Sequence, residues 1–121
     1  MSVFQKISED KIIYKGNYFF MIYDAYPVSE NHILIISNRK CQDYFDLNLD
    51  EQQERPAMIN KAQELIEKSC TPDGYNIGMN CGEASGQTVM HFHCHVIPRF
   101  KNDVEDPRGG IRHCVMHKGY Y

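Results

Sequence analysis

The sequence predicts an α+β fold, with a five-stranded antiparallel sheet, one long helix and a short helical turn. Segments rich in β-branched and aromatic residues occur in the order strand–strand–strand–helix–strand–strand, without the strict alternation typical of parallel sheets. One long segment carries apolar residues at helical spacing. The 121 residues fit a single domain, 1–121, in which roughly two-thirds of the unfolded surface can be buried.

Three strands should form the first part of the sheet. Residues 11–15 and 18–24 are rich in β-branched and aromatic side chains. Gly16-Asn17 between them is a two-residue connection with turn chemistry, which predicts a hairpin. After a loop at residues 27–31, residues 32–37 are apolar on both faces beyond the initial His32, so we expect a central strand.

The helical elements should follow. A short helical turn is expected around residues 41–45. Asp50, with Gln53 three residues later, imitates a capping box and should begin the long helix, which Pro72-Asp73-Gly74 stops. Pro56 must either kink this helix or mark its true start. The stripe that should pack on the sheet consists of Met58, Ile59, Ala62, Leu65 and Ile66.

The last two strands enclose a loop of small residues. Residues 75–80 should form the fourth strand, and residues 81–86 the loop. In the fifth strand, three of the chain's six histidines alternate with apolar residues, which predicts a strand with one buried face. One face should carry His91, His93 and His95, and the core face Phe92, Cys94 and Val96. The strand should end near Pro98.

Composition narrows the functional classes. A formal charge of -3 and a mean hydropathy of -0.52 describe a soluble protein without a bias toward nucleic acid or membranes. No apolar run approaches the ~18 residues of a membrane span, and the N-terminal residues do not resemble a secretory signal. Five cysteines, an odd number without a C-x-x-C pair, predict free thiols in a reducing compartment, the cytoplasm.

Three interpretations of the histidine row are open. It could be a plain row of surface histidines. It could bind a metal ion, as His-x-His strands bind zinc. His91 and His95 would lie about 13 Å apart along the strand, so the three rings could not easily reach one ion. Two of these histidines could do so together with His32. It could also perform covalent catalysis on phosphorus, because neutral imidazole is nucleophilic near its unperturbed pKa of roughly 6.5. A glycine-rich loop before the row offers backbone N–H groups to phosphate.

Residues 91–97 have the form His-φ-His-φ-His-φ-φ, where φ is apolar. With this motif the chain resembles the histidine triad (HIT) superfamily of nucleotide hydrolases and transferases. The resemblance extends over most of the chain, in the correct order, and includes residues 23–28, 31–36, 73–80, 82–88 and Pro98-Arg99. It implies a single HIT-like domain and a homodimer in which two five-stranded sheets join.

The resemblance implies a role for each matching residue. His93 would attack the α-phosphorus and form a nucleotidyl-histidine, from which water releases a nucleoside monophosphate. His95 would contact the phosphate and assist the leaving group, while His91 and His32 would form a relay that fixes the ring of His93. Asp24 would accept hydrogen bonds from the ribose hydroxyls. Four residues would hold the phosphate and leaving-group side: Asn80, Gly86, Gln87 and Thr88. Alternatively, Asn80, Gln87 and Thr88 could serve only to fix the conformation of a loop.

The resemblance also sets expectations about cofactors and alternatives. Many family members carry an N-terminal Cys-x-x-Cys that contributes to a zinc site, whereas residues 3–6 contain no cysteine, so no protein-bound metal is expected. No cofactor should be required, although a divalent cation can accompany a polyphosphate substrate. Nucleoside phosphoramidates and diadenosine polyphosphates are the expected substrate types. A metal-binding histidine module and a non-catalytic nucleotide-binding scaffold remain as alternative functions.

Overall fold

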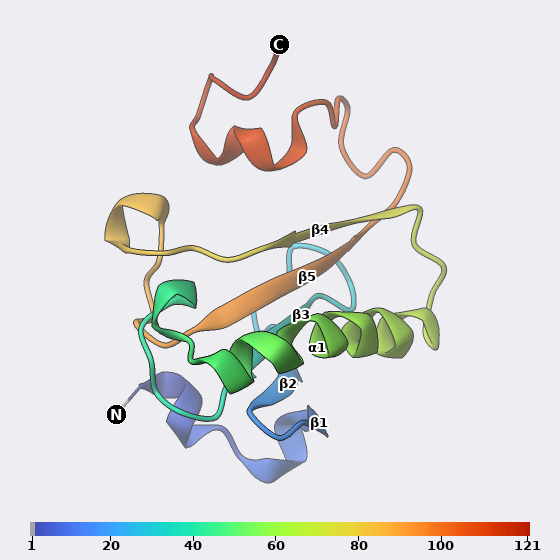
Figure 1. Ribbon diagram of the computed structural model, residues 1–121. Coiled ribbons are helices and arrows are strands. Elements are labelled where there is room, and N and C mark those ends of the chain that lie inside the picture. Colours follow the sequence, from blue (N-terminus) through green and yellow to red (C-terminus); the bar gives the residue numbers. More distant parts are fainter. Residues whose placement is uncertain (1) are drawn as a thin grey trace.

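The computed structural model describes residues 2–121 and confirms the predicted fold class (Figure 1). Met1, the first residue of the predicted domain 1–121, lies outside the described residues. The strands and the helix are β1 (Ile12–Lys15), β2 (Phe19–Tyr23), β3 (Ile33–Ser37), α1 (Leu49–Glu67), β4 (Gly74–Gly78) and β5 (His93–Arg99). Short 3₁₀ turns cover Val3–Lys6, Glu9–Lys11, Tyr44–Asp46, Glu83–Ser85 and Gly110–Cys114. Within residues 2–121, no helix has the length and apolar character needed to span a bilayer.

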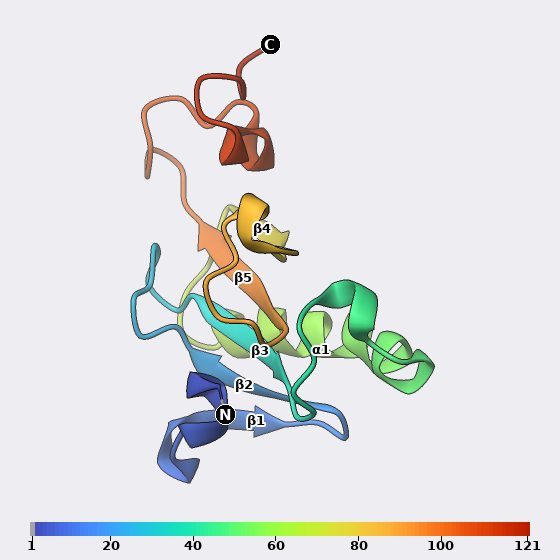
Figure 2. The ribbon, with the colours of Figure 1, turned by 90° about the vertical axis from the view of Figure 1, so that its left-hand side faces the viewer.

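The five strands form one antiparallel sheet in the order β1-β2-β3-β5-β4, which Figure 2 shows from β1 at the bottom to β4 at the top. β3 is the middle strand, and all five of its residues are buried, as its apolar sequence predicted. β5 lies between β3 and β4, so the histidine strand has neighbours on both sides. β5 continues through Pro98 to Arg99, one residue beyond the predicted end.

The β1–β2 hairpin forms where the sequence predicted it, but for a different reason. The Gly16 N–H donates to the Phe19 carbonyl at 2.8 Å. Gly16 is not among the residues with positive φ, so the turn does not use the left-handed region that glycine favours. A Cβ on Gly16 would instead lie 2.7 Å from Glu54 Oε1 and 2.8 Å from Met58 Sδ. A larger residue fits at this position only if these two flexible side chains of α1 shift.

Helix α1 begins one residue earlier than predicted, and its capping box uses a different pair. Asn48 is the N-cap, and its side chain accepts from the Glu51 N–H at 2.9 Å while Glu51 Oε1 accepts from the Asn48 N–H at 2.8 Å. The predicted pair of Asp50 and Gln53 is therefore wrong. Pro56 lies inside the helix and does not mark its start. The helix ends at Glu67, well before Pro72.

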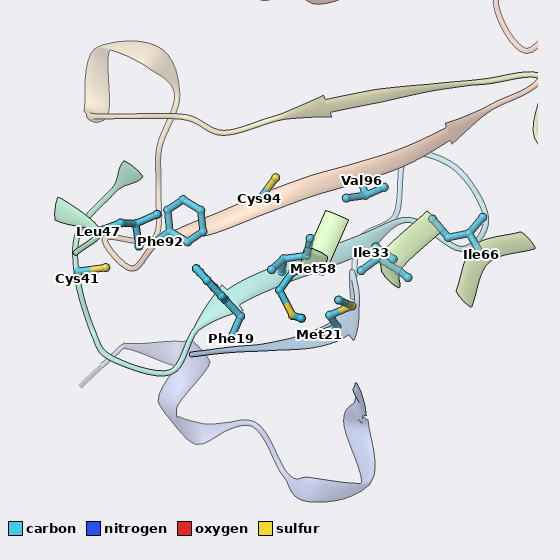
Figure 3. Packing of buried hydrophobic residues seen from close by; sticks show 12 residues of the cluster. Phe19, Met21, Ile33, Cys41, Leu47, Met58, Ile66, Phe92, Cys94 and Val96 are labelled. Carbon is cyan, nitrogen blue, oxygen red and sulfur yellow. The ribbon is translucent and has the colours of Figure 1, made fainter. Parts of the chain in front are cut away.

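The two faces of the sheet are covered by different parts of the chain. Met58, Ala62 and Ile66 of α1 pack on one face against residues of β2, β3 and β5 (Figure 3). The other face carries a smaller cluster of Ile22, Leu34 and Ile36, against which Phe4, Ile7, Ile12 and Phe20 pack. The N-terminal segment thus covers part of the face opposite α1 (Figure 2).

The register of β5 assigns its side chains to these faces. Cys94 lies opposite Ile35 and Val96 opposite Ile33, and all four belong to the core under α1. His93 lies opposite Ile36 and His95 opposite Leu34, on the face that the N-terminal segment borders. The prediction that Phe92, Cys94 and Val96 enter the core is confirmed.

Replacing Arg39 by alanine should lower the free energy of unfolding by about 2 kcal/mol. Glu51 is only 2% exposed, and its carboxylate accepts from Arg39 at 2.7 and 3.3 Å, so the substitution leaves a buried charge with one partner fewer. Urea unfolding measures the loss. Lys15→Ala, which breaks an exposed ion pair with Glu9, is the control and should change stability by less than about 0.5 kcal/mol. Equal losses in the two variants would contradict this account.

Candidate active site

His91 precedes β5, and its ring lies on the same side of the sheet as His93, because Phe4 packs against both rings, with the centroids 5.6 and 5.0 Å apart. Its side chain is 1% exposed, and Nε2 lies 2.7 Å from the carbonyl oxygen of Ser37 while Nδ1 lies 2.6 Å from Ser2 Oγ. A carbonyl oxygen only accepts, so Nε2 carries the proton and Nδ1 accepts from the serine hydroxyl. The side predicted for His91 therefore agrees with the structure, but its ring is buried and both of its nitrogens already have partners.

The ring of His93 is oriented by a main-chain group. Its Nδ1 lies 2.9 Å from the carbonyl oxygen of His91, so Nδ1 must carry the proton that is donated. Nε2 is then unprotonated and keeps a free lone pair. Phe4 packs edge-on against the ring, with the centroids 5.0 Å apart. The ring therefore presents a nucleophilic nitrogen and has restricted rotation.

A second chain of hydrogen bonds links His32 to His95. The Val28 N–H donates to His32 Nδ1 at 3.3 Å, so the proton of a neutral His32 sits on Nε2. This Nε2 lies 2.9 Å from His95 Nδ1, which accepts, and the proton of a neutral His95 is therefore on Nε2. The predicted relay of His91 and His32 around His93 is corrected here. His32 orients His95, and only the backbone of His91 contacts His93.

Burial favours the neutral form of His32, His91 and His95. It lowers the pKa of His32 and of His91, and it lowers the pKa of His95 to about 4, where the neighbouring His93 and His32 lower it further. Near pH 7 the free protein therefore holds His95 as a neutral imidazole. The same group will bind a proton more readily when an anion lies beside it.

Asp24 follows β2 and lies at the rim of the same group. Oδ1 accepts from the Tyr26 N–H at 2.9 Å, and Oδ2 lies 3.5 Å from His32 Nε2. The side chain is 16% exposed, so the carboxylate retains acceptor capacity toward the cavity. A partly exposed carboxylate of this kind is what Asp24 would need to accept hydrogen bonds from ribose hydroxyls, as predicted.

The residues able to hold a metal ion are Asp24, His32 and His95, whose ligand atoms all lie within 4.8 Å of one another. The structure thus brings His32 together with one motif histidine, not two. Binding an ion would require His32 Nε2 to lose its proton and the 2.9 Å contact with His95 to break. The hydrogen bonding in place disfavours the metal interpretation, since both nitrogens of His32 and Nδ1 of His95 already have partners.

A cavity of about 500 Å³ opens in front of these side chains. Its polar lining comes from Asp24, Asn80, Gly86, Thr88, His93 and His95, and its apolar lining from Val3, Phe4, Ile7, Ile22, Leu34 and Val89, with Ala25 and Tyr26 at the rim. A second cavity, of about 520 Å³, shares Asn80 and His95 with the first. Most of the predicted site residues therefore converge on one cavity.

Gln87, like His32 and His91, does not line this cavity. It is 3% exposed, its Oε1 accepts from the Gly82 N–H at 2.8 Å, and its Nε2 donates to the carbonyls of Gln42 and Val89 at 2.6 and 3.1 Å. These three hydrogen bonds hold the loop. The structure thus fits the alternative that Gln87 ties down the loop, and its nucleotide contact stays a prediction. Gly86, with φ 97°, occupies the left-handed region beside it.

Sequence reasoning missed Ser2, Phe4, Val28 and Ser37. Val28 and Ser37 act through a main-chain N–H and a main-chain carbonyl. Every residue type supplies these groups, so the sequence gives no signal for them. Ser2 and Phe4 belong to a short N-terminal turn without a recognisable motif. Apolar character at Phe4 was the single available hint that this segment packs on the sheet.

Comparison with known proteins supports this geometry. A family model described as HIT domain matches residues 5–102. An AP-4-A phosphorylase of Mycobacterium tuberculosis is 30% identical over 96 residues, which are 78% of this chain and 49% of that protein. An asymmetrical bis(5′-nucleosyl)-tetraphosphatase of Schizosaccharomyces pombe is 36% identical over 80 residues, which are 66% of this chain and 44% of that protein. The chain thus spans about half the length of these curated relatives.

A solved structure shows the same fold. The crystal structure of a HIT family protein from Bacillus anthracis is 33% identical, with a TM-score of 0.71, and the match covers 77% of this chain and 67% of that one. The five-stranded sheet with one long helix is therefore shared with this group.

Acidification should destabilise the protein through His95. Its pKa is 6.5 unfolded and about 4 folded, so its contribution is complete above pH 6.5 and is lost as the pH falls toward 4. Between pH 7 and pH 5 this contribution falls by about 2 kcal/mol. Urea unfolding at both pH values measures the decline. His95→Gln should reduce the decline by about that amount, and identical declines in variant and wild type would refute the assignment.

Proposed function

The chain belongs to the HIT family, and we propose that it is a nucleotide hydrolase or transferase that acts on an α-phosphorus through a covalent nucleotidyl-His93. The observation that carries this proposal is the hydrogen bond from His93 Nδ1 to the His91 carbonyl. It leaves Nε2 as the unprotonated nitrogen at a cavity that also contains Asp24, Asn80 and His95. A neutral imidazole held in this way is competent to attack phosphorus near pH 7.

In the first step His93 Nε2 attacks the α-phosphorus, and the bond to the leaving atom breaks as the P–N bond forms. The anionic phosphate favours protonation of His95, whose pKa is low in the free protein. Protonated His95 carries a proton on each nitrogen, so His32 Nε2 accepts from His95 Nδ1 in its other tautomer, and His95 gives the proton on Nε2 to the leaving atom. In the second step water attacks phosphorus, His95 accepts the proton of the water, and the P–N bond breaks to release a nucleoside monophosphate.

The other cavity residues bind and orient the nucleotide. Asp24 accepts hydrogen bonds from the ribose hydroxyls with the capacity that Tyr26 and His32 leave free. Asn80, Thr88 and the backbone of Gly86 bind the phosphate, which lies beside His93. The base lies among the apolar side chains Val3, Phe4, Ile7, Ile22 and Leu34. Gln87 supports the loop, and its own contact with the nucleotide stays a prediction.

The names of the relatives support the substrate class. They describe proteins acting on diadenosine tetraphosphate or on a bis(5′-nucleosyl) tetraphosphate. For this chain the proposed activity is that of a nucleotide phosphoramidase or polyphosphate hydrolase, which needs no bound cofactor. A divalent cation would enter with a polyphosphate as part of the substrate. Five free thiols fit a reducing compartment, which we propose is the cytoplasm.

Replacing His93 by alanine should lower the turnover of adenosine 5′-phosphoramidate and diadenosine polyphosphate on the order of 10³-fold or more. Removing the nucleophile leaves binding groups but no covalent route. Intact mass spectrometry of wild type during turnover should detect an adenylyl adduct, which the variant should lack. Cys94→Ala is the matched control, because Cys94 is adjacent, buried and outside the cavity.

The alternatives give different results in the same assays. A nucleotide-binding scaffold would bind the ligand without forming product or adduct. A metal module would hold stoichiometric zinc after purification and would lose its activity with a chelator. Full activity in His93→Ala would end the proposal of a covalent nucleotidyl-His93.

We also propose that two copies associate into a homodimer by joining their sheets. β1 and β4 are the two edge strands, and β4 exposes Ile77 at 45%. Analytical ultracentrifugation should give about twice the mass of 14.1 kDa. A protein that remains at one chain's mass at micromolar concentration would contradict this association.

A further inference from the structure

We propose that Ser2 is a positioning residue for His93 and acts through the side chain of His91. The Ser2 hydroxyl completes the hydrogen bonding of the His91 ring, and the main chain of His91 in turn orients the nucleophile. The N-terminal turn then contributes to alignment of the nucleophile as well as covering the sheet. This inference rests on the proposed function, because it takes His93 as the nucleophile.

The Ser2 hydroxyl is directed to His91, while the main chain of Ser2 serves its own turn. The Ser2 N–H donates to Gln5 Oε1 at 2.7 Å, and the Ser2 carbonyl accepts from the Gln5 N–H at 3.1 Å. The hydroxyl lies 2.6 Å from His91 Nδ1, on a residue 89 positions later in the chain. The hydroxyl therefore joins the turn to the segment just before β5.

The ring of His91 needs this donor. It is 1% exposed, and its Nε2 donates to the Ser37 carbonyl on β3, so Nδ1 has an unprotonated lone pair. A buried acceptor that has no donor costs free energy. The hydroxyl of Ser2 satisfies Nδ1, and the ring is thus held at both nitrogens, by β3 and by the N-terminal turn.

Holding this ring helps to fix the carbonyl that orients His93. The peptide group between His91 and Phe92 is planar, and its N–H donates to the Cys41 carbonyl at 2.7 Å. This hydrogen bond anchors one side of the plane but still lets the plane pivot about the N–H···O direction. The Cα of His91, which carries the pinned ring, is the second anchor. With both in place, the His91 carbonyl stays 2.9 Å from His93 Nδ1.

Phe4 connects the same turn to both imidazoles. Its ring packs edge-on against His91 and His93, with the centroids 5.6 and 5.0 Å apart. Val3 and Phe4 also line the cavity proposed for the nucleotide. Displacing the whole turn would therefore remove part of the cavity wall together with the hydroxyl. A test of Ser2 has to remove the hydroxyl and leave the turn in place.

Ser2→Thr and Ser2→Val form a matched pair, because the two side chains have nearly the same shape and only threonine keeps a hydroxyl. A cavity of about 330 Å³ beside Ser2 has room for the added methyl group, and its other lining residues are Val3, Lys40, Thr88, Val89 and Met90. Valine also leaves less space than alanine for a water molecule that would replace the hydroxyl.

With adenosine 5′-phosphoramidate, Ser2→Val should lower kcat by roughly 10-fold and change KM by less than about 3-fold. The reason is that the cavity walls remain while the nucleophile is less well aligned. Ser2→Thr should restore kcat to within about 3-fold of wild type.

The tautomer of His93 is a readout that a purely structural role of Ser2 would not change. ¹⁵N NMR of the imidazole groups at pH 8 identifies the nitrogen that carries the proton. In wild type and Ser2→Thr this should be Nδ1, whereas Ser2→Val should show a measurable fraction with the proton on Nε2. The measurement needs no substrate. Failure of the proposed function is therefore distinguishable, since wild type would then not turn over the phosphoramidate while the tautomer still reports on Ser2.

Gln5→Ala is the control for the turn itself. Gln5 is exposed, and its side chain accepts from the Ser2 N–H without contacting His91, so kcat and the His93 tautomer should stay near their wild-type values. Four results overturn the proposal: unchanged kcat in Ser2→Val, an equal loss in Ser2→Thr, the same loss in Gln5→Ala, and a loss in Ser2→Val with the tautomer of His93 unchanged.

Discussion

The hydrogen bond between His93 Nδ1 and the carbonyl oxygen of His91, 2.9 Å long, sets the chemistry of the whole cavity. It assigns the proton of His93 to one nitrogen and the free lone pair to the other. The carbonyl can do this only if the His91 backbone is fixed. The buried side chain of His91 fixes it, through Ser37 on β3 and Ser2 in the N-terminal turn. The reactivity of one imidazole thus depends on the burial of another.

This dependence explains how far the sequence could predict the site. Alternation of apolar and polar residues assigns faces correctly wherever a strand is paired, as it does for Cys94 and Val96. It does not reveal where pairing begins. His91 lies before the first residue of β5, yet its side chain keeps the period of two and contacts Phe4 on the side of His93. Main-chain carbonyls and N–H groups, which orient His93 and His32, are present at every position and leave no sequence signal.

The same distinction holds for the fold. Strand segments, their apolar faces and the central place of β3 follow from local composition and were predictable. The predicted capping box lies two residues too late, since Asn48 with Glu51 and Asp50 with Gln53 are both acceptable pairs by type. Gln87 was assigned to the ligand because a polar residue in a glycine-rich loop suits either role. The Gln87 amide donates to the carbonyl of Gln42, which lies 45 residues away in sequence. Only the tertiary fold shows that these two groups meet.

His95 stands between two cavities, and its position explains why a low pKa is useful there. A neutral imidazole can be buried among Leu34, His32 and His93 without a counter-ion. The negative charge that would protonate it belongs to the α-phosphate, so the acid forms when the substrate is bound.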